Sequence, residues 1–264
     1  MPLYEVFIPN ENNDGKGRKG QVKADTWTAA LKTGLKKVGG GEVDTRSLMC
    51  DIKEDGRMDV TDPKSGRVFV IRDLDASGGE APEITEVKGR GKVSARPVAE
   101  ILGELFGETS RIYDNKSLKD ASEFVLGLAH KAIPSESGSV LIADINEDDL
   151  EFLAATGPKA SDVMKFRVPM GQGIVGFAAQ EGVSLAVSDV EKDERFYKDI
   201  SDKIGYPVSS LIVSSIERDG RTFGAIELIN REGGSSYSAD DMAVLDFLAY
   251  ELCSYLINTQ QTGS

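Results

Sequence analysis

A stretch without apolar periodicity divides this chain into two parts that must fold separately. Residues 74–97 are rich in glycine, proline, serine and charged side chains, and their apolar residues do not recur at the spacing of a helix or a strand. Such a composition buries too little apolar surface to offset the entropy lost on ordering. We therefore expect a small domain at 1–75, a flexible linker at 76–97, a larger domain at 98–258 and a disordered tail at 259–264.

The small domain shows the alternating pattern of short strands around one helical pattern. Asp25 is the expected N-cap of the helix, and the glycines at 39–41 are expected to end it. The turns between strands have Asp-Gly or Asp-Pro chemistry. Strands are expected at 4–8, 20–24, 47–53, 57–61 and 67–72, and the helix at 27–38. The order ββαβββ predicts one helix packed on an antiparallel sheet.

The larger domain mixes helical and strand patterns. Pro134 ends the second helical stripe, and a glycine-rich turn at 171–173 precedes the third helix. Helices are expected at 98–112, 117–132, 174–181 and 240–257, with a helical, lid-like stretch at 193–204. Strands are expected at 139–144, 150–156, 164–169, 184–187, 210–217 and 221–230.

The charge distribution argues against nucleic acid as a partner. Residues 1–75 carry equal numbers of acidic and basic side chains, so the formal net charge of −13 belongs to the remainder. An acidic surface repels phosphate backbones. A basic cluster in the small domain is flanked by Asp14 and Asp25 and is interpreted as a solvated hairpin; it consists of Lys16, Arg18, Lys19 and Lys23.

Catalytic, metal and membrane signatures are not found in the sequence. Cys50 and Cys253 lie far apart and are interpreted as idle thiols, and His130 has no metal-ligating residue near it in sequence. The carboxylates at 147–149 fall in a polar turn. We expect no catalysis, no metal and no cofactor. No apolar run approaches the roughly 20 residues of a membrane helix, and no signal peptide is visible, so we expect a cytoplasmic protein without a membrane partner.

Three motifs of the larger domain occur in the order and spacing of one family. They are VPMGQGIVGFAA from Val168, SDVEKDERFYKDISDKIGYPVSSLIVSSI from Ser188, and RTFGAIELINREGGSSYSADD from Arg221. Over about residues 98–258 the chain resembles the GAF family, and within it the cyclic-nucleotide branch. The resemblance implies an α+β fold, with an antiparallel sheet flanked by helices. The glycines at 171, 173 and 176 either serve turn geometry alone or leave backbone N–H groups free for an anion.

The resemblance also implies a set of ligand-binding residues. A glutamate in the pocket accepts hydrogen bonds from a purine edge, and a tyrosine stacks on a base. The implied residues are Ser139, Gly173, Ile174, Val175, Phe196, Tyr197, Ile204, Val208 and Glu227. The chain departs from the branch at four of its positions. Ile204 and Val208 replace threonines, Ser201 replaces an acid and Pro207 replaces an arginine. Because apolar groups cannot hold a phosphate or the polar edge of a purine, these departures argue against a cyclic nucleotide as the ligand.

The last motif implies a structural pair. Arg231 and Asp241 stand where the family places a cation and a carboxylate, and we expect them to join the last strand to the last helix. Cysteines that attach a bilin or reduce methionine sulfoxide in other relatives have no counterpart in the pocket segments.

We therefore expect a non-catalytic, bacterial-type signalling protein. Its GAF domain would sense a small, nucleotide-like ligand and pass the signal to a separate protein partner. The alternative is a GAF scaffold without a ligand that mediates protein interaction and dimerisation. The apolar residues of the helix at 98–112 are more than one sheet face can cover, so they predict a homodimer, unless that helix folds back onto its own chain.

Overall fold

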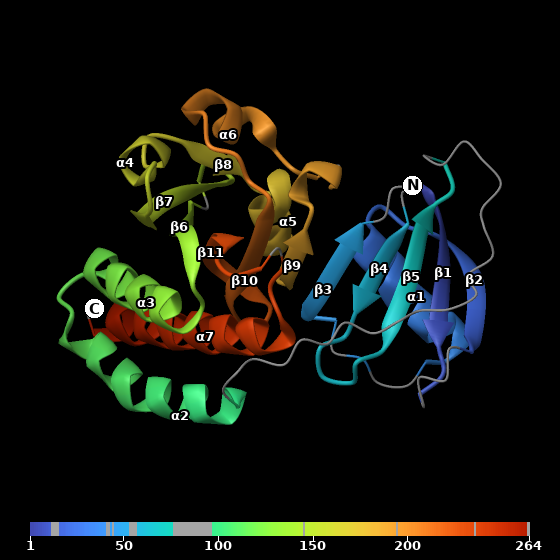
Figure 1. Cartoon of the computed structure of the whole chain (residues 1–264), viewed down its shortest axis with the longest axis horizontal. Helices are drawn as coiled ribbons and strands as arrows, with labels where there is room; N and C mark the ends of the chain where they lie inside the picture. Colours follow the sequence, from blue (N-terminus) through green and yellow to red (C-terminus); the bar gives the residue numbers. More distant parts are fainter. Residues whose placement is uncertain are drawn as a thin grey trace. The chain divides into compact units, whose positions relative to one another are not determined.

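The chain forms two compact units, Met1–Lys92 and Val93–Ser264 (Figure 1). The structure, a computed structural model, describes residues 1–11, 16–40, 43, 45–52, 57–75, 97–144, 146–193, 195–234 and 236–262. Apart from Pro97, the linker expected at 76–97 lies outside these residues. So does the expected turn at 54–56.

The first unit has the ββαβββ order that the sequence predicts. Its described elements are β1 (Leu3–Pro9), β2 (Gly17–Lys23), α1 (Trp27–Val38), β3 (Ser47–Ile52), β4 (Met58–Thr61) and β5 (Val68–Asp73). In the sheet the strands follow one another as β2-β1-β5-β4-β3. The pairs β2-β1, β1-β5, β5-β4 and β4-β3 are all antiparallel, as expected for short hairpin connections.

Helix α1 packs on this sheet through one apolar face. Trp27, Ala30 and Leu31 are buried against β1, β2 and β5. The N-cap is Thr26 and not Asp25 as expected, because the Thr26 hydroxyl accepts a hydrogen bond from the Ala29 N–H at 3.2 Å. Gly39 ends the helix as predicted, with φ +72° and its N–H donating to the Leu35 carbonyl.

The second unit is an α+β fold, as predicted. The described helices are α2 (Val98–Thr109), α3 (Leu118–Ala132), α4 (Ala160–Val163), α5 (Gly173–Glu181), α6 (Lys198–Ile204) and α7 (Ala239–Thr262), with 3-10 turns at Ser110–Asp114 and Val190–Lys192. The described strands are β6 (Ser135–Asp144), β7 (Asp149–Thr156), β8 (Arg167–Pro169), β9 (Ser184–Ser188), β10 (Ser210–Arg218) and β11 (Arg221–Arg231).

The strands of the second unit form an antiparallel sheet between two helical layers. Their order is β9-β10-β11-β6-β7-β8. Helices α3 and α7 cover one face, and α2 packs on α7 and α3 (Figure 1). Helix α5 packs against β10 and β11 on the other side, where α4 and α6 also lie. The central strands are therefore buried on both faces, and Val213, Ile226 and Leu228 have no exposed surface.

Several boundaries differ from the prediction. Strand β6 begins at Ser135 and not Ser139, because Ser135, Ser137 and Gly138 still pair with β11, which apolar periodicity does not reveal. The stretch expected as a strand from Met164 starts only at Arg167, after the unpredicted helix α4. Of the described residues in the lid-like stretch expected at 193–204, only Lys198–Ile204 is helical, and a 3-10 turn at Val190–Lys192 lies before it.

The last helix is longer than expected. Helix α7 continues to Thr262, so the tail expected at 259–264 is helical as far as that residue, and 263–264 lie outside the described residues. Its first turn is held by a reciprocal cap. The Asp241 N–H donates to the Ser238 hydroxyl at 3.1 Å, and the Ser238 N–H donates to Asp241 Oδ2 at 2.7 Å.

Candidate functional site

A cavity of about 110 Å³ lies in the second unit, on the side of the sheet where α4, α5 and α6 pack. Side chains from β6, β11, the start of α5 and the segment 195–208 converge on it. Apolar atoms form most of its wall. All nine residues that the resemblance implied line this cavity: Ser139, Gly173, Ile174, Val175, Phe196, Tyr197, Ile204, Val208 and Glu227.

The start of α5 reaches the cavity because of its glycines. Gly173 has φ +72°, a conformation that side chains other than glycine rarely adopt. A Cβ on Gly173 would also lie 3.0 Å from Cβ of Tyr197. Glycine therefore allows the 195–208 segment to approach α5 closely, and it places Ile174 and Val175 at the cavity wall. Since Gly173 begins the helix, its first turn faces the same space.

Glu227 is the buried acidic group of the cavity. The residue is 5% exposed, and Ser139 Oγ donates a hydrogen bond to Glu227 Oε1 at 2.6 Å. The two strands place these residues opposite one another, because Glu227 of β11 pairs with Ser139 of β6. Burial raises the pKa of Glu227 to about 7, and the bond from Ser139 lowers this pKa only in part. Near neutral pH the carboxyl can therefore either donate or accept a hydrogen bond.

Asn230 ties the far end of the 195–208 segment to the sheet. This residue has φ +56° at the end of β11. Its Nδ2 donates to the Pro207 carbonyl at 2.9 Å, and its Oδ1 accepts from the Ser209 N–H at 2.8 Å. Nδ2 also donates to Glu136 Oε2 at 2.9 Å. One amide side chain thus fixes the chain directly after Tyr206, which lines the cavity.

Further polar residues of the cavity were not predicted. Ser137 Oγ donates to the Tyr206 hydroxyl at 3.0 Å, and that hydroxyl donates to Glu136 Oε2 at 3.1 Å. Thr156 and Lys159 also line the cavity. Ser137 was missed because it lies in the polar start of β6, and Lys159 because it precedes the unpredicted α4. Tyr206 belongs to one of the motifs quoted above. Its position between Gly205 and Pro207 indicates that the backbone there has a defined conformation, and this signal could have identified Tyr206.

His130 lies outside the cavity wall but contacts it. Its Nε2 is 2.6 Å from Thr156 Oγ1, and Thr156 Oγ1 donates to the Gly138 carbonyl at 3.2 Å. Because that hydroxyl proton is used, Nε2 is the donor in the first bond. Burial lowers the pKa of His130. A backbone hydrogen bond with Ser135 and the charge of Glu232 oppose this shift in part. The bond to Thr156 makes His130 a support of the β6-β7 wall.

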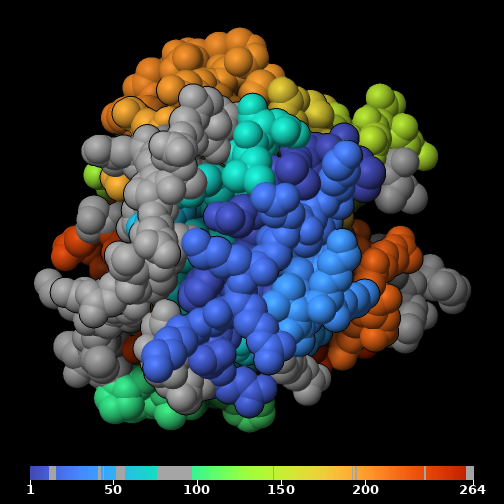
Figure 2. All heavy atoms as spheres, turned by 90° about the vertical axis from the view of Figure 1, so that its right-hand side faces the viewer, coloured from blue at the N-terminus to red at the C-terminus, as the bar shows by residue number. Residues whose placement is uncertain are grey.

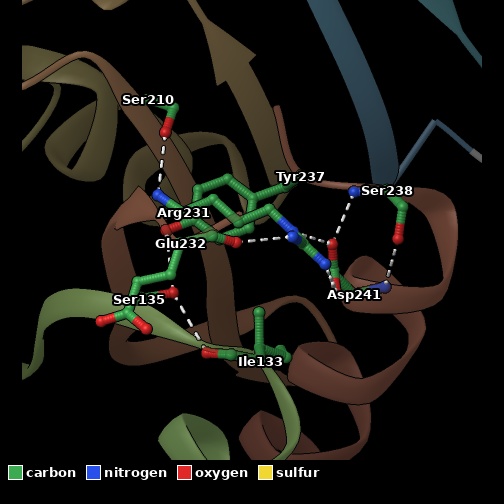
Figure 3. A network of polar contacts seen from close by, with 8 residues as sticks. All are labelled: Ile133, Ser135, Ser210, Arg231, Glu232, Tyr237, Ser238 and Asp241. Atoms are coloured by element: carbon green, nitrogen blue, oxygen red, sulfur yellow. Dashed lines mark hydrogen bonds and ion pairs between the residues drawn. The ribbon is translucent and has the colours of Figure 1, made fainter. Parts of the chain in front are cut away.

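Arg231 and Asp241 join the last strand to the last helix (Figure 3). Arg231 Nε donates to Asp241 Oδ2 at 2.8 Å, and Nη2 donates to Oδ1 at 3.3 Å. The pair raises the pKa of Arg231. The Tyr237 hydroxyl donates to Ser135 Oγ in the same network at 3.1 Å. The pair lies outside the cavity wall, and its contacts are those of a structural link between β11 and α7.

Metal and membrane signatures were searched in the part of the chain that the structure describes. No group of three or more His, Cys, Asp or Glu side chains there has the arrangement of a metal site. None of the helices described is both long and apolar enough to cross a membrane.

Comparison with known proteins identifies the second unit. Residues 115–253, more than half of the chain, match the protein family described as GAF domain. The chain belongs to the GAF domain family. We call the second unit the GAF unit and its cavity the GAF cavity.

Two curated relatives of this GAF protein are described as phosphodiesterases. It is 28% identical over 141 residues to the dual 3',5'-cyclic-AMP and -GMP phosphodiesterase 11A of Takifugu rubripes, covering 46% of this chain and 16% of that protein. It is 24% identical over 135 residues to the probable 3',5'-cyclic phosphodiesterase pde-5 of Caenorhabditis elegans, covering 48% of this chain and 18% of the relative. The chain therefore spans less than a fifth of the length of these relatives.

Solved GAF structures share the fold. The GAF domain of a phosphoenolpyruvate-protein phosphotransferase from Coxiella burnetii matches with a TM-score of 0.57 at 18% identity, over 64% of this chain and 99% of that one. The free methionine-R-sulfoxide reductase of Neisseria meningitidis matches with a TM-score of 0.54 at 20% identity, over 64% and 96%. At these identities the likeness concerns the fold and not the chemistry.

Proposed function

We propose that the GAF unit is a non-catalytic sensor that binds a small ligand in the GAF cavity and passes the signal to a separate protein. The observation that carries this proposal is the buried pair of Glu227 and Ser139 in an otherwise mostly apolar cavity. A carboxyl held at 5% exposure costs folding free energy. Carboxyl groups with a shifted pKa in a cavity are typical of functional sites. We assign this carboxyl to ligand binding and not to catalysis.

The chemistry of the cavity favours a flat, largely apolar ligand that carries an N–H group. Glu227 would hydrogen-bond to the N–H group, and Tyr197 and Phe196 offer ring faces to a planar molecule. A nucleobase has both features. The names of the curated relatives, which specify cyclic nucleotides, support testing nucleotide-like compounds first.

The size of the cavity adds a condition to this proposal. At about 110 Å³ it is smaller than the roughly 300–1,000 Å³ that drug-sized ligands occupy. A nucleotide would therefore require the 195–208 segment to move outward, whereas a smaller molecule would not. Asn230 holds the end of that segment, so we place the hinge of such a movement before Pro207.

A route for the signal follows β11. Glu227 and Arg231 lie on the same strand, and Arg231 pairs with Asp241 at the start of α7. Ser214 of β10 adds a second link, donating to Asp246 Oδ1 of α7 at 2.6 Å. A ligand that shifts β11 would thus shift α7, whose Tyr250 is 52% exposed and would be accessible to a protein partner. We place this role in the cytoplasm and expect neither nucleic acid nor a membrane as partner.

A thermal-shift screen of the full chain tests the proposal. Nucleobases, nucleosides, cyclic and linear nucleotides and small amines are compared, and at least one class is expected to raise Tm saturably. Glu227→Ala and Tyr197→Ala should reduce that shift. Glu123→Ala and Tyr250→Ala serve as controls, because both residues are exposed and lie outside the cavity wall. If no compound stabilises the protein, the sensor proposal fails, and a ligand-free scaffold for protein interaction and dimerisation replaces it.

A further inference from the structure

A second cavity lies in the first unit, at the end of β1 and the C-terminal end of α1. It has a volume of about 110 Å³, and polar atoms form most of its wall. We call it the arginine pocket and define it by Arg18, Arg67, Asn10, Gly39 and Gly40. Figure 2 looks onto the side of the first unit where the N-terminal strands and α1, in blue, reach the surface.

Arg67 is a buried cation in this pocket. The residue is 4% exposed. Its Nη1 donates to the Gly40 carbonyl at 2.6 Å, Nη2 donates to the Pro9 carbonyl at 2.7 Å, and the guanidinium lies 5.1 Å from the centre of the Phe69 ring. Its buried Nε has no hydrogen-bond partner. None of these contacts supplies a full negative charge, and Arg67 forms no ion pair with any described residue.

Arg18 adds a second cation to the same wall. Its Nη1 donates to the Val38 carbonyl at 2.8 Å, so the two arginines bind carbonyls at the C-terminal end of α1. A purely structural role as helix caps would explain these bonds. However, the end of a helix carries only about half a negative charge. Glu11 also lines the pocket, but it is exposed and forms no ion pair with either arginine. Among the described residues that line the pocket, the two arginines therefore outnumber the one acidic side chain.

A buried cation with no ion-pair partner among the described residues calls for a compensating group, because desolvation costs several kcal/mol unless a partner compensates it. The compensating group must fit the space. A pocket of about 110 Å³ has room for a few water molecules or for one small oxyanion. Guanidinium groups match carboxylate and phosphate through paired N–H donors, and each arginine retains donors beyond those used on the carbonyls.

We propose that the arginine pocket binds a small oxyanion of the carboxylate or phosphate type, and that Arg18 and Arg67 hold it. This would make the first unit a binding module in its own right. The proposal is independent of the GAF cavity, because it rests on residues of the first unit alone.

An NMR titration of the ¹⁵N-labelled full chain tests this proposal. Inorganic phosphate and acetate are added separately, with sodium chloride keeping the ionic strength constant. The amide signals of Gly39 and Gly40 should shift saturably with at least one of the two anions. The comparison of the two titrations decides between phosphate and carboxylate. Shifts that stay linear with both anions, or that sodium chloride alone reproduces, would overturn the proposal.

Variants make the test specific. Arg67→Gln also removes two bonds to backbone carbonyls and can unfold the unit, so Arg18→Gln carries the test. It should weaken binding at least about fivefold, the effect of roughly 1 kcal/mol from one near charge. Glu11→Gln should strengthen binding, because it removes a repelling charge. Lys37→Gln is the control: an exposed cation of α1 outside the pocket wall that should leave binding unchanged. Equal affinities of Arg18→Gln and the wild type would contradict the assignment.

Discussion

Burial of Glu227 lowers the stability of the fold and places a polar group in the GAF cavity. An apolar side chain between β6 and β10 would fit the mostly apolar wall without a desolvation cost. The carboxyl instead relies on one hydrogen bond from Ser139 at 2.6 Å. Because its pKa rises to about 7, folding binds a proton that the unfolded chain releases near its ordinary pKa of 4.5. The consequence is a pH dependence of stability that can be measured.

We predict that Glu227→Gln removes this pH dependence. The wild type binds more protons when folded, so its stability relative to the variant falls as pH rises from about 4.5 to about 7. At pH 8 the variant should be more stable, by on the order of 3 kcal/mol at most, since each pKa unit corresponds to about 1.4 kcal/mol. Urea unfolding of both proteins at pH 5 and pH 8 measures the difference. Glu123→Gln, which changes an exposed carboxyl, is the control. Parallel pH profiles for wild type and Glu227→Gln would contradict the assigned pKa.

At the scale of elements, the 195–208 segment and α7 are each joined to β11 by a polar contact near its end. Asn230 binds the segment. Arg231, the next residue of the strand, binds the helix on the other face of the sheet (Figure 3). Neighbouring side chains on a strand point to opposite faces, which makes this arrangement possible. The end of β11 is therefore where the GAF cavity and α7 are mechanically connected.

We predict that Asn230→Gly loosens the 195–208 segment. Glycine accepts the φ of +56° but loses the bonds to Pro207, Ser209 and Glu136. The free energy of unfolding should fall by about 1–3 kcal/mol. Hydrogen exchange of the amides in the segment should accelerate more than exchange elsewhere. Asp219→Gly is the matched control, because Asp219 also has positive φ, at 55°, but in an exposed hairpin turn. Equal exchange in both variants would show that Asn230 does not hold the segment.

We predict that Arg231 and Asp241 contribute to stability through one shared interaction. A double-mutant cycle with Arg231→Ala and Asp241→Ala should give a coupling of about 1 kcal/mol, because the Asp241 side chain is 8% exposed and that of Arg231 only 23%. Asp241→Ala alone should cost more than the coupling, since it also removes the cap on Ser238. A cycle of Arg231 with the neighbouring Asp240 is the control and should show no coupling. Additive effects in the first cycle would mean that the pair contributes nothing.

At the scale of the whole molecule, the open question is what covers the helical layer of the GAF unit. Helix α2 folds back onto α7 and α3 of its own chain, and Leu105 is buried there. Part of the apolar stripe that predicted a homodimer is thus already covered. Phe106 of α2 nevertheless stays 71% exposed, and Tyr250 of α7 stays 52% exposed. Large apolar groups left exposed on two packed helices favour a further protein surface over them.

The homodimer therefore stays a prediction, with Phe106 as its test. Phe106→Glu should convert a dimer into a folded monomer, which sedimentation equilibrium and circular dichroism measure together. Leu105 is unsuitable for this purpose, because at 3% exposure its replacement would disturb the fold. Met164→Glu is the control, since Met164 is an exposed apolar residue, at 37%, beside α4 on the other layer. A wild type that is monomeric at tens of micromolar would exclude the dimer.

From the sequence alone, the ββαβββ order, most helices and strands of the GAF unit, and the nine residues of its cavity wall could be predicted. Periodicity and turn chemistry are local, so they are visible in a short window around Trp27 or Gly39. The cavity residues came from motifs whose order implied a known fold. Features that depend on distant partners were missed. Strand β6 starts early because Ser135 and Ser137 pair with β11, and polar residues give no periodic signal there.

Tertiary structure decided the chemistry of both cavities. The pKa of Glu227 depends on how completely the sheet and α5 exclude water, and no sequence window contains that information. The basic cluster around Arg18 was interpreted as a solvated hairpin, and Arg67 was not singled out. Only the fold brings Arg18 and Arg67 to one pocket at the end of α1, far apart as they are in sequence. The burial of a group and its distance from other charges depend on residues from distant parts of the chain, so the electrostatics could not be predicted from the sequence. Helix and strand propensity is local, so the elements could be predicted.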